Sequence, residues 1–168
     1  MTGGAEHHAA AELLTALERR GWSLAVAESL TGGAVCSALV AVPGASRVLR
    51  GGVTAYATDL KARLLGVDAA LLELRGAVDP DVAAAMATGV RERLSADVGL
   101  ATTGVAGPDA QDGRPPGTVY VAVATADEVR VESLHVPGGR AAVRDAAVDR
   151  AIRLALVVVR EHGTAVPR

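Results

Sequence analysis

The chain has almost no aromatic side chains and only one cysteine. Phenylalanine is absent from its 168 residues and aromatic residues make up 2%, so the core must consist of alanine, valine and leucine, which favours close packing of helices on a sheet. Cys36 cannot form an internal disulfide, which fits a reducing cytoplasm, where we expect the protein to reside. The histidines stand at positions 7, 8, 135 and 162, without the spacing of zinc ligands, so we expect no metal site.

The chain also lacks long apolar runs and an excess of basic charge. No run approaches the roughly 20 apolar residues that a membrane span requires. The formal net charge is -2 and the arginines are scattered without a basic stripe, which argues against direct binding of nucleic acid. Residues 1–8 carry an acid and no positively charged segment, so they do not resemble a signal peptide and are expected to be disordered.

Lysine is nearly absent as well. Of the 17 basic residues, Lys61 is the only lysine and all others are arginine. Arginine stays protonated in proteins, whereas the pKa of a buried lysine shifts readily and its neutral amine can act as a general base. Lys61 is therefore a candidate for chemistry that needs a neutral amine. The alternative is an ordinary lysine on a solvated helix face.

A turn with two hydroxyls and two glycines joins a short apolar run to a helical run at residues 27–33. Such a turn aims free backbone N–H groups and the positive end of a helix dipole at an anion or a developing oxyanion. Ser29 stands where a nucleophile would be presented, and Leu30, Thr31, Gly32 and Gly33 follow it. The alternative is a hydroxyl that only caps a helix beside flexible glycines.

The periodicity of apolar residues predicts strands that alternate with helices, followed by a hairpin and a last helix. The expected helices are 9–20, 32–41, a short helix from residue 58, 68–75, one that begins at Asp79-Pro80, and 140–161. The expected strands are 22–27, 48–57, 98–103, 118–124 and 129–136. The last two should pair antiparallel, because nothing helical lies between them. This order predicts an α/β fold with a mixed sheet covered on both faces, in one domain over residues 1–168.

Ligands of such folds sit beyond the strand ends. Three loops there carry glycine and a reactive group: 28–33, 56–61 with Tyr56 and Lys61, and 103–108 with Thr103 and Gly104. Either Thr58 or Asp59 could cap the short helix that carries Lys61. Arg140, behind two glycines at the start of the last helix, suits a phosphate or carboxylate.

Seven segments in this order resemble the CinA C-terminal domain family, the nicotinamide-nucleotide amidases. They are Ala27-Glu28-Ser29-Leu30-Thr31-Gly32-Gly33, Gly51-Gly52-Val53 with Tyr56 and Lys61, Leu64-Leu65-Gly66-Val67, Gly76-Ala77-Val78, Thr103-Gly104-Val105-Ala106-Gly107-Pro108, Gly117-Thr118-Val119-Tyr120 and Pro137-Gly138-Gly139-Arg140. The likeness covers nearly the whole chain, from about residue 9 to 160.

The resemblance implies a three-layer α/β/α sandwich with a mixed, mainly parallel sheet, usually found as a homo-oligomer. It implies hydrolysis of nicotinamide mononucleotide to nicotinic acid mononucleotide and ammonia, without a cofactor, so that nucleotide returns to NAD synthesis. Full-length CinA proteins carry another domain in front, and this chain resembles the stand-alone form.

The resemblance also implies roles for individual residues. Ser29 corresponds to the nucleophile and Lys61 to its base, with Tyr56, Thr103 and Arg140 at positions of further active-site residues. In the expected mechanism, amides of the turn at 30–33 hold the oxyanion and Gly104 contributes to the substrate site. Tyr56 and Thr103 would orient Lys61 or relay its proton. Arg140 would hold the phosphate or the ribose side.

Two departures from the family pattern bear on specificity. Leu30 stands where the family commonly has cysteine, and Thr58 where it has asparagine; the loop at 109–116, with Arg114-Pro115, also differs. Two alternatives therefore stay open. One is an amidase for a different amide-bearing nucleotide. The other is a non-catalytic nucleotide-binding or interaction module linked to competence or DNA damage.

Overall fold

The computed structural model describes residues 3–162, which build one five-stranded sheet with helices on both faces. The elements are α1 (Gly3–Arg20), β1 (Leu24–Glu28), α2 (Ala34–Val40), the 3₁₀ turn η1 (Ala45–Arg47), β2 (Leu49–Thr54), α3 (Thr58–Leu65), α4 (Ala69–Arg75), α5 (Pro80–Arg93), β3 (Val98–Gly104), β4 (Thr118–Ala124), β5 (Val129–His135) and α6 (Arg140–Glu161).

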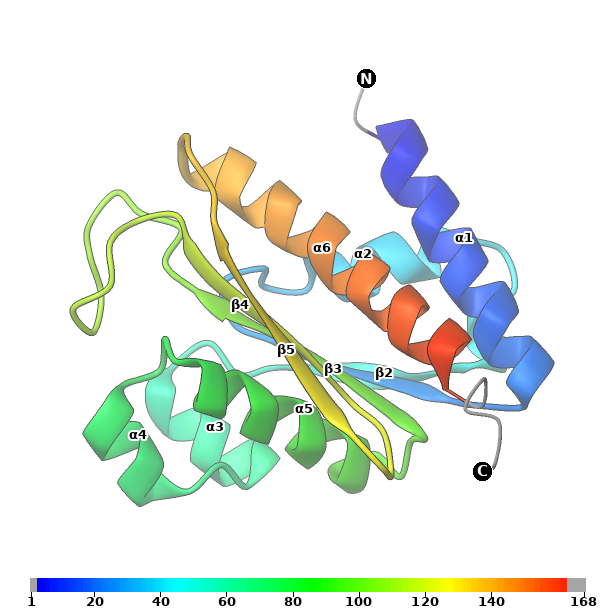
Figure 1. The fold of residues 1–168 in the computed structure, drawn as a ribbon, viewed down its shortest axis with the longest axis horizontal. Coiled ribbons are helices and arrows are strands. Elements are labelled where there is room, and N and C mark those ends of the chain that lie inside the picture. The colour runs from blue at the N-terminus through cyan, green and yellow to red at the C-terminus, as the bar shows by residue number, and fades with distance from the viewer. Residues whose placement is uncertain (1–2, 163–168) are drawn as a thin grey trace.

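The sheet has the strand order β2-β1-β3-β4-β5. β1 pairs parallel with β2 and β3, while β4 pairs antiparallel with β3 and β5, so only β4 runs against the other strands. α1, α2 and α6 cover one face, and α3, α4 and α5 cover the other (Figure 1). The predicted α/β class, the mixed, mainly parallel sheet and the antiparallel hairpin are confirmed.

Residues of β1 alternate between two apolar cores. Val26 belongs to the cluster under α1 and α6, with Leu13 and Ile152, whereas Ala27 faces the cluster under α5, with Met86. β1 is buried along its whole length, as expected for a central strand with both faces covered. Small side chains therefore let helices approach both faces of the strand that ends directly before Ser29.

Several element boundaries differ from the sequence prediction. α1 begins at Gly3 rather than at residue 9, so residues 3–8, for which the sequence predicts disorder, lie in a helix whose residues Ala9 and Ala10 are buried. Residues 1–2 of that segment lie outside the described residues. α2 begins at Ala34 rather than at residue 32, because Gly32 (φ 60°) and Gly33 (φ 99°) take left-handed conformations that cannot continue a helix.

The second strand ends at Thr54 rather than at residue 57, because its neighbour β1 ends opposite, at Glu28. The residue that precedes α3 is Ala57, whose side chain makes no capping bond, so the expected cap by Thr58 or Asp59 is wrong. The expected cap of α5 is confirmed, since the Asp79 carboxylate accepts from the amide of Asp81 at 2.9 Å.

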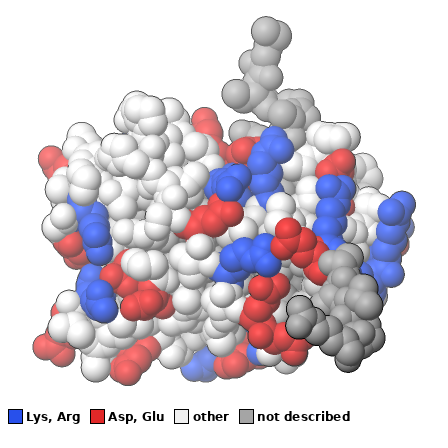
Figure 2. Space-filling view, in the orientation of Figure 1, with Lys and Arg blue, Asp and Glu red and all other residues white. Residues whose placement is uncertain are grey.

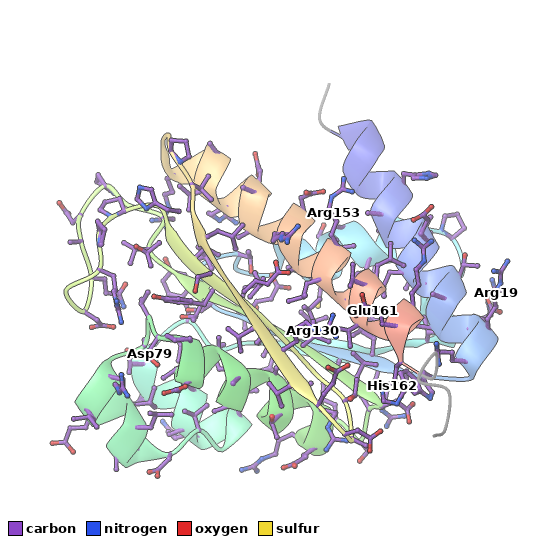
Figure 3. All side chains as sticks on the ribbon, viewed as in Figure 1. Arg19, Asp79, Arg130, Arg153, Glu161 and His162 are labelled. Carbon is purple, nitrogen blue, oxygen red and sulfur yellow. The ribbon has the colours of Figure 1, made fainter. Side chains whose placement is uncertain are left out.

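The surface carries interspersed charges of both signs (Figure 2). Ion pairs join separate elements at its edges: Arg130 of β5 binds Glu161 at the end of α6, with Nη1 2.7 Å from Oε2 (Figure 3). Within residues 3–162, no helix combines the length and the apolar character that crossing a membrane requires.

Candidate active site

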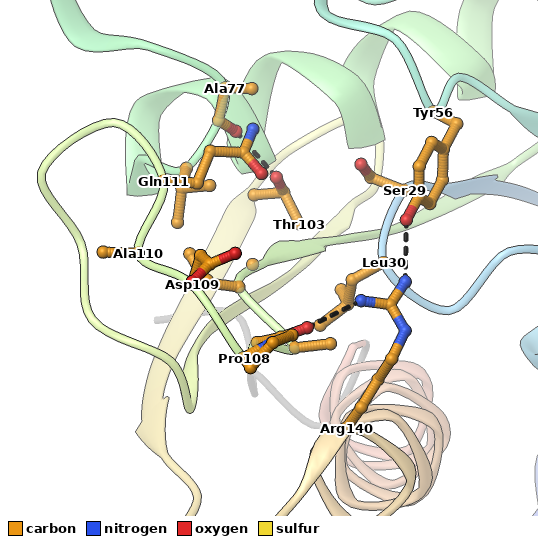
Figure 4. Close-up of a pocket in the computed structure, with 15 residues that line it drawn as sticks. Ser29, Leu30, Tyr56, Ala77, Thr103, Pro108, Asp109, Ala110, Gln111 and Arg140 are labelled. Atoms are coloured by element: carbon orange, nitrogen blue, oxygen red, sulfur yellow. Dashed lines mark hydrogen bonds between the residues drawn. The ribbon is translucent and has the colours of Figure 1, made fainter.

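Ser29 follows β1 directly and faces a cavity beyond the strand end (Figure 4). Its amide donates to the carbonyl of Thr102 in β3 at 3.1 Å, which continues the sheet by one bond. Only 8% of the residue is exposed. The strand end therefore presents one hydroxyl in a largely dry position.

Lys61, in the first turns of α3, is fully buried behind Ser29. Its Nζ lies 3.1 Å from Ser29 Oγ, 2.8 Å from the carbonyl oxygen of Ala55 and 3.3 Å from that of Tyr56. Carbonyls only accept hydrogen bonds, so a neutral amine donates its two N–H groups to them and turns its lone pair toward the serine hydroxyl. The early end of β2 creates this arrangement, because it leaves both carbonyls outside the sheet.

Burial lowers the pKa of Lys61 from 10.5 to about 8, and the Asp112 carboxylate opposes this shift. A buried ammonium loses hydration that three hydrogen bonds only partly replace. A substantial fraction of Lys61 is then neutral near physiological pH. A general base must lie at hydrogen-bond distance from the proton that it removes, and the position of Lys61 meets this requirement for the Ser29 hydroxyl.

The amides of the serine turn are not all available to an oxyanion. Glu28, 1% exposed, accepts from the amides of Gly33 (3.0 Å), Val35 (3.0 Å) and Cys36 (2.9 Å), and so caps α2. The amide of Gly32 donates to the carbonyl of Ser29 at 3.1 Å. The oxyanion role expected for Gly32 and Gly33 is therefore wrong for their amides.

Two amides of that turn remain. Those of Leu30 and Thr31 donate to no acceptor in the part of the chain that the structure describes. Thr31 is also held by its hydroxyl, which lies 2.8 Å from that of Thr102 in the buried interior. Leu30 lines the cavity beside Ser29. Of the amides expected over residues 30–33 to hold an oxyanion, only those of Leu30 and Thr31 are thus without an acceptor among the described residues.

The cavity has a volume of about 270 Å³ and lies where the three predicted loops meet. This is near the lower end of the range for small-molecule sites. Its lining residues are Ser29, Leu30, Tyr56, Ala77, Val78, Thr103, Gly104, Val105, Ala106, Gly107, Pro108, Asp109, Ala110, Gln111 and Arg140. Sequence reasoning missed residues 109–111, because their composition indicates only an exposed loop.

Tyr56, Thr103 and Arg140 all reach the cavity, as predicted, but the two hydroxyls do not contact Lys61. The Tyr56 phenol accepts from Arg140 Nη2 at 2.8 Å, and Arg140 Nη1 donates to the carbonyl of Gly107 at 2.9 Å (Figure 4). Thr103 Oγ1 donates to the carbonyl of Ala77 at 2.6 Å. Tyr56 orients Lys61 through its backbone carbonyl instead of its phenol.

Gly104 combines a place in the cavity wall with a packing requirement. A Cβ at this position would lie 2.5 Å from the carbonyl oxygen of Thr118 in β4, so no larger residue fits without a shift of the backbone. Its lack of a side chain keeps the wall close to Leu30, whose Cδ1 would be 3.1 Å from that Cβ. Gly104 therefore shapes the cavity by its lack of a side chain and not by a chemical group.

Cys36, the only cysteine of the chain, lies near the start of α2. Burial, followed by the charge of Glu28 and a hydrogen bond to it, raises the pKa of the Cys36 thiol to about 12, which makes it a poor nucleophile. Among the described residues, no group of three or more His, Cys, Asp or Glu side chains is placed to hold a metal ion.

The CinA C-terminal domain family model matches residues 6–159. This match spans most of the chain and includes every residue of the site. The chain belongs to the CinA C-terminal domain family. The resemblance drawn from seven sequence segments is thereby confirmed.

CinA relatives extend well beyond this match. The CinA-like protein of Frankia casuarinae is 49% identical over 152 residues, which cover 90% of this chain and 35% of that protein. The CinA-like protein of Gemmatimonas aurantiaca is 44% identical over 163 residues, covering 96% of this chain and 38% of that protein. The chain thus spans about a third of the length of these curated relatives.

Solved CinA structures of similar length share the fold. A competence-damaged protein (CinA) superfamily protein from Klebsiella pneumoniae superposes with a TM-score of 0.89 at 30% identity, covering 93% of this chain and 98% of that one. A competence/damage inducible protein from Agrobacterium tumefaciens gives a TM-score of 0.88 at 31% identity, covering 93% and 96%. These names refer to a superfamily and to induction by competence or damage, and not to a reaction.

Proposed function

We propose that this CinA domain is an amidohydrolase that converts nicotinamide mononucleotide to nicotinic acid mononucleotide and ammonia. The single observation that carries the proposal is the pair of Ser29 Oγ and Lys61 Nζ, 3.1 Å apart, with the amine buried and the hydroxyl facing a cavity. An amide is a poor electrophile, so its hydrolysis requires an activated nucleophile, which this pair supplies.

The reaction has two halves. In the first, the proton of Ser29 moves to the lone pair of Lys61 while Oγ attacks the carboxamide carbon, and the amides of Leu30 and Thr31 stabilise the oxyanion. The carbon–nitrogen bond then breaks, and Lys61 returns its proton to the leaving nitrogen, which departs as ammonia. In the second half, Lys61 takes a proton from water as the water oxygen attacks the ester carbon, the bond from that carbon to Ser29 Oγ breaks, and Lys61 returns the proton to Oγ. The acid product leaves as its carboxylate and releases a proton to solvent.

The nucleotide end of the substrate is assigned to Arg140. Its guanidinium is held by Tyr56 and by the carbonyl of Gly107, which fixes its position at the mouth of the cavity. A guanidinium forms paired hydrogen bonds with phosphate oxygens. This assignment supports a phosphate-bearing substrate, whereas Leu30 and Thr58 leave the choice among amide-bearing nucleotides to experiment.

A non-catalytic module is the second candidate, favoured by the competence and damage terms in the titles of solved relatives. Burial of Lys61 weighs against it. Placing an amine in the interior costs stability, which a module without chemistry gives no reason to accept, and this chain meets its other needs for positive charge with arginine. The cytoplasmic location stays a prediction from the single cysteine, and the homo-oligomeric state stays a prediction from the family resemblance.

Ammonia release from nicotinamide mononucleotide by the purified protein tests the proposal. We expect turnover in the wild type and a loss of at least about 1,000-fold in Ser29→Ala and in Lys61→Met, because each variant removes one member of the pair. Arg63→Met, on the exposed face of the same helix, is the control and should keep wild-type activity. Nucleotide binding without ammonia release in the wild type would favour the module instead.

A further inference from the structure

Arg144 reaches from α6 to the serine turn, a contact that the sequence analysis did not predict. Its Nε donates to the carbonyl of Leu30 at 3.0 Å, and its Nη2 donates to the carbonyl of Thr31 at 2.8 Å. Leu30 and Thr31 are the two residues that directly follow Ser29 in the turn. The side chain is partly buried, so both bonds form away from bulk water.

This pair of bonds fixes two successive peptide planes. A guanidinium is planar and holds its donors in a rigid fork, so two bonds to it define an orientation as well as a distance. In a planar trans peptide the C=O and the following N–H point to opposite sides. Holding the Leu30 carbonyl therefore also directs the Thr31 amide, one of the two turn amides without an acceptor among the described residues.

The turn ends in two glycines, which offer no side chain to hold it in place. Gly32 and Gly33 both have positive φ and separate Thr31 from the first turn of α2. On the opposite side, β3 holds the turn through Thr102, which binds the amide of Ser29 and the hydroxyl of Thr31. Arg144 supplies the second support, from a different layer of the fold.

Arg144 does not reach the substrate cavity itself. Arg140, one helical turn earlier, lines that cavity, whereas Arg144 is not among its lining residues. Two arginines on the same side of α6 thus serve different partners. One faces the space for a ligand and the other faces the backbone that carries the nucleophile.

We propose that Arg144 is a positioning residue of the nucleophile turn. By holding the carbonyls of Leu30 and Thr31, it keeps Ser29 Oγ aligned with Lys61 and keeps the two free amides in place for the oxyanion. The catalytic consequence of this inference rests on the proposed function, whereas the labelling rate of Ser29 tests the positioning itself. Misplacement of a reacting group by about 1 Å can cost about 100-fold in rate.

Arg144→Lys tests this role because it keeps the charge and removes the fork. Arg150→Lys, on the same helix in a surface ion pair with Glu132, is the matched control. The measurements are the rate at which a fluorophosphonate labels Ser29, the kcat and KM for nicotinamide mononucleotide, and the melting temperature. We expect labelling and kcat of Arg144→Lys to fall by about 10- to 100-fold, with KM within about twofold of wild type. The control should match wild type.

A second variant separates positioning from folding. Arg144→Ala should recover part of its labelling rate when ethylguanidinium is added, because the cation can occupy the space left by the side chain and donate to the same carbonyls. Ser29→Ala should not label at all. A labelling rate of folded Arg144→Lys within about twofold of wild type would overturn the proposal. So would a loss of folding in both variants that ethylguanidinium does not reverse, since Arg144 would then only support the fold.

The two proposals fail in different ways. If the wild type labels at Ser29 but releases no ammonia from the nucleotide, and Arg144→Lys labels slowly, the proposed substrate is wrong and the positioning role stands. If the nucleotide is hydrolysed at equal kcat by wild type and Arg144→Lys, the function stands and the positioning role fails. An unreactive Ser29 in the folded wild type contradicts both.

Discussion

At the scale of single residues, the surroundings of Lys61 set how activity depends on pH. Its pKa is lowered to about 8 by burial, and only the neutral amine can accept the proton of Ser29. We therefore expect kcat/KM for nicotinamide mononucleotide to rise with pH and to level off above a midpoint near 8. A profile that is flat between pH 6 and 9, or that falls over this range, would contradict Lys61 as the base.

The same residue makes stability depend on pH. Lys61 has a lower pKa in the folded protein, about 8, than in the unfolded chain, 10.5, so between these values only the unfolded chain binds the proton. The free energy of unfolding should therefore rise with pH across this window, by roughly 3 kcal/mol in total, and the gain is absent below pH 8.

Denaturant titrations of wild type and Lys61→Met at several pH values would measure this term. The comparison must be a difference, because the raised pKa of Cys36 contributes with the opposite sign above pH 9. We expect the rise between pH 8 and 10.5 in the wild type and not in Lys61→Met. Parallel curves for the two proteins would show that folding does not lower the pKa of Lys61.

Composition and motif singled out the candidate reactive residues but not the residues that hold them in place. Lys61 stood out because the chain uses arginine everywhere else, and Ser29 because it precedes two glycines at a strand end. Arg144 is one of 16 arginines and gave no signal, since its partners are backbone carbonyls more than 100 positions away. The hydrogen bonds that the amides of Gly32 and Gly33 donate within the protein were likewise not predictable, because they depend on how the turn folds.

At the scale of elements, the junction of β1 and α2 depends on Glu28. Its carboxylate accepts three amides at the start of α2, so it occupies the place where a helix would otherwise bind an anion. Glu28→Gln removes the charge and part of the acceptor capacity. We expect the free energy of unfolding to fall by about 1–3 kcal/mol in urea titrations. Glu18→Gln, at an exposed ion pair, should stay within about 0.5 kcal/mol of wild type.

The contact between α3 and α5 depends on a glycine. A Cβ at Gly89 would lie 1.9 Å from the carbonyl oxygen of Leu65, at the end of the helix that carries Lys61. Alanine normally stabilises a helix relative to glycine by about 1 kcal/mol. Here we expect Gly89→Ala to lower the melting temperature, because α3 must move, and to lower kcat with it. An increase in melting temperature would show that the two helices do not pack this closely.

Element types were predictable from periodicity, whereas their ends were not. The alternation of strands and helices, the β4–β5 hairpin and the proline start of α5 follow from local sequence. The end of β2 at Thr54 is set by the length of its neighbour β1, which is a tertiary property. That boundary matters most for function, since it exposes the carbonyls of Ala55 and Tyr56 to Lys61.

At the scale of the whole molecule, the strand order brings the reactive loops together. β1 lies between β2 and β3, so the loops that leave these three parallel strands emerge side by side at one edge of the sheet. The sequence predicted that a mixed sheet would gather them at its strand ends. It did not predict the contribution of α6, which reaches the same edge from across the sheet through Arg140 and Arg144.

The central claim is that the folded chain holds Lys61 next to Ser29 as a partly neutral amine. Since Lys61 is the only lysine, selective labelling with carbon-13 at lysine Cε gives a single side-chain NMR signal to titrate. We expect its midpoint near pH 8 in the folded protein and near 10.5 after unfolding in urea. A midpoint near 10.5 in the folded protein would show a solvated ammonium and would contradict the account.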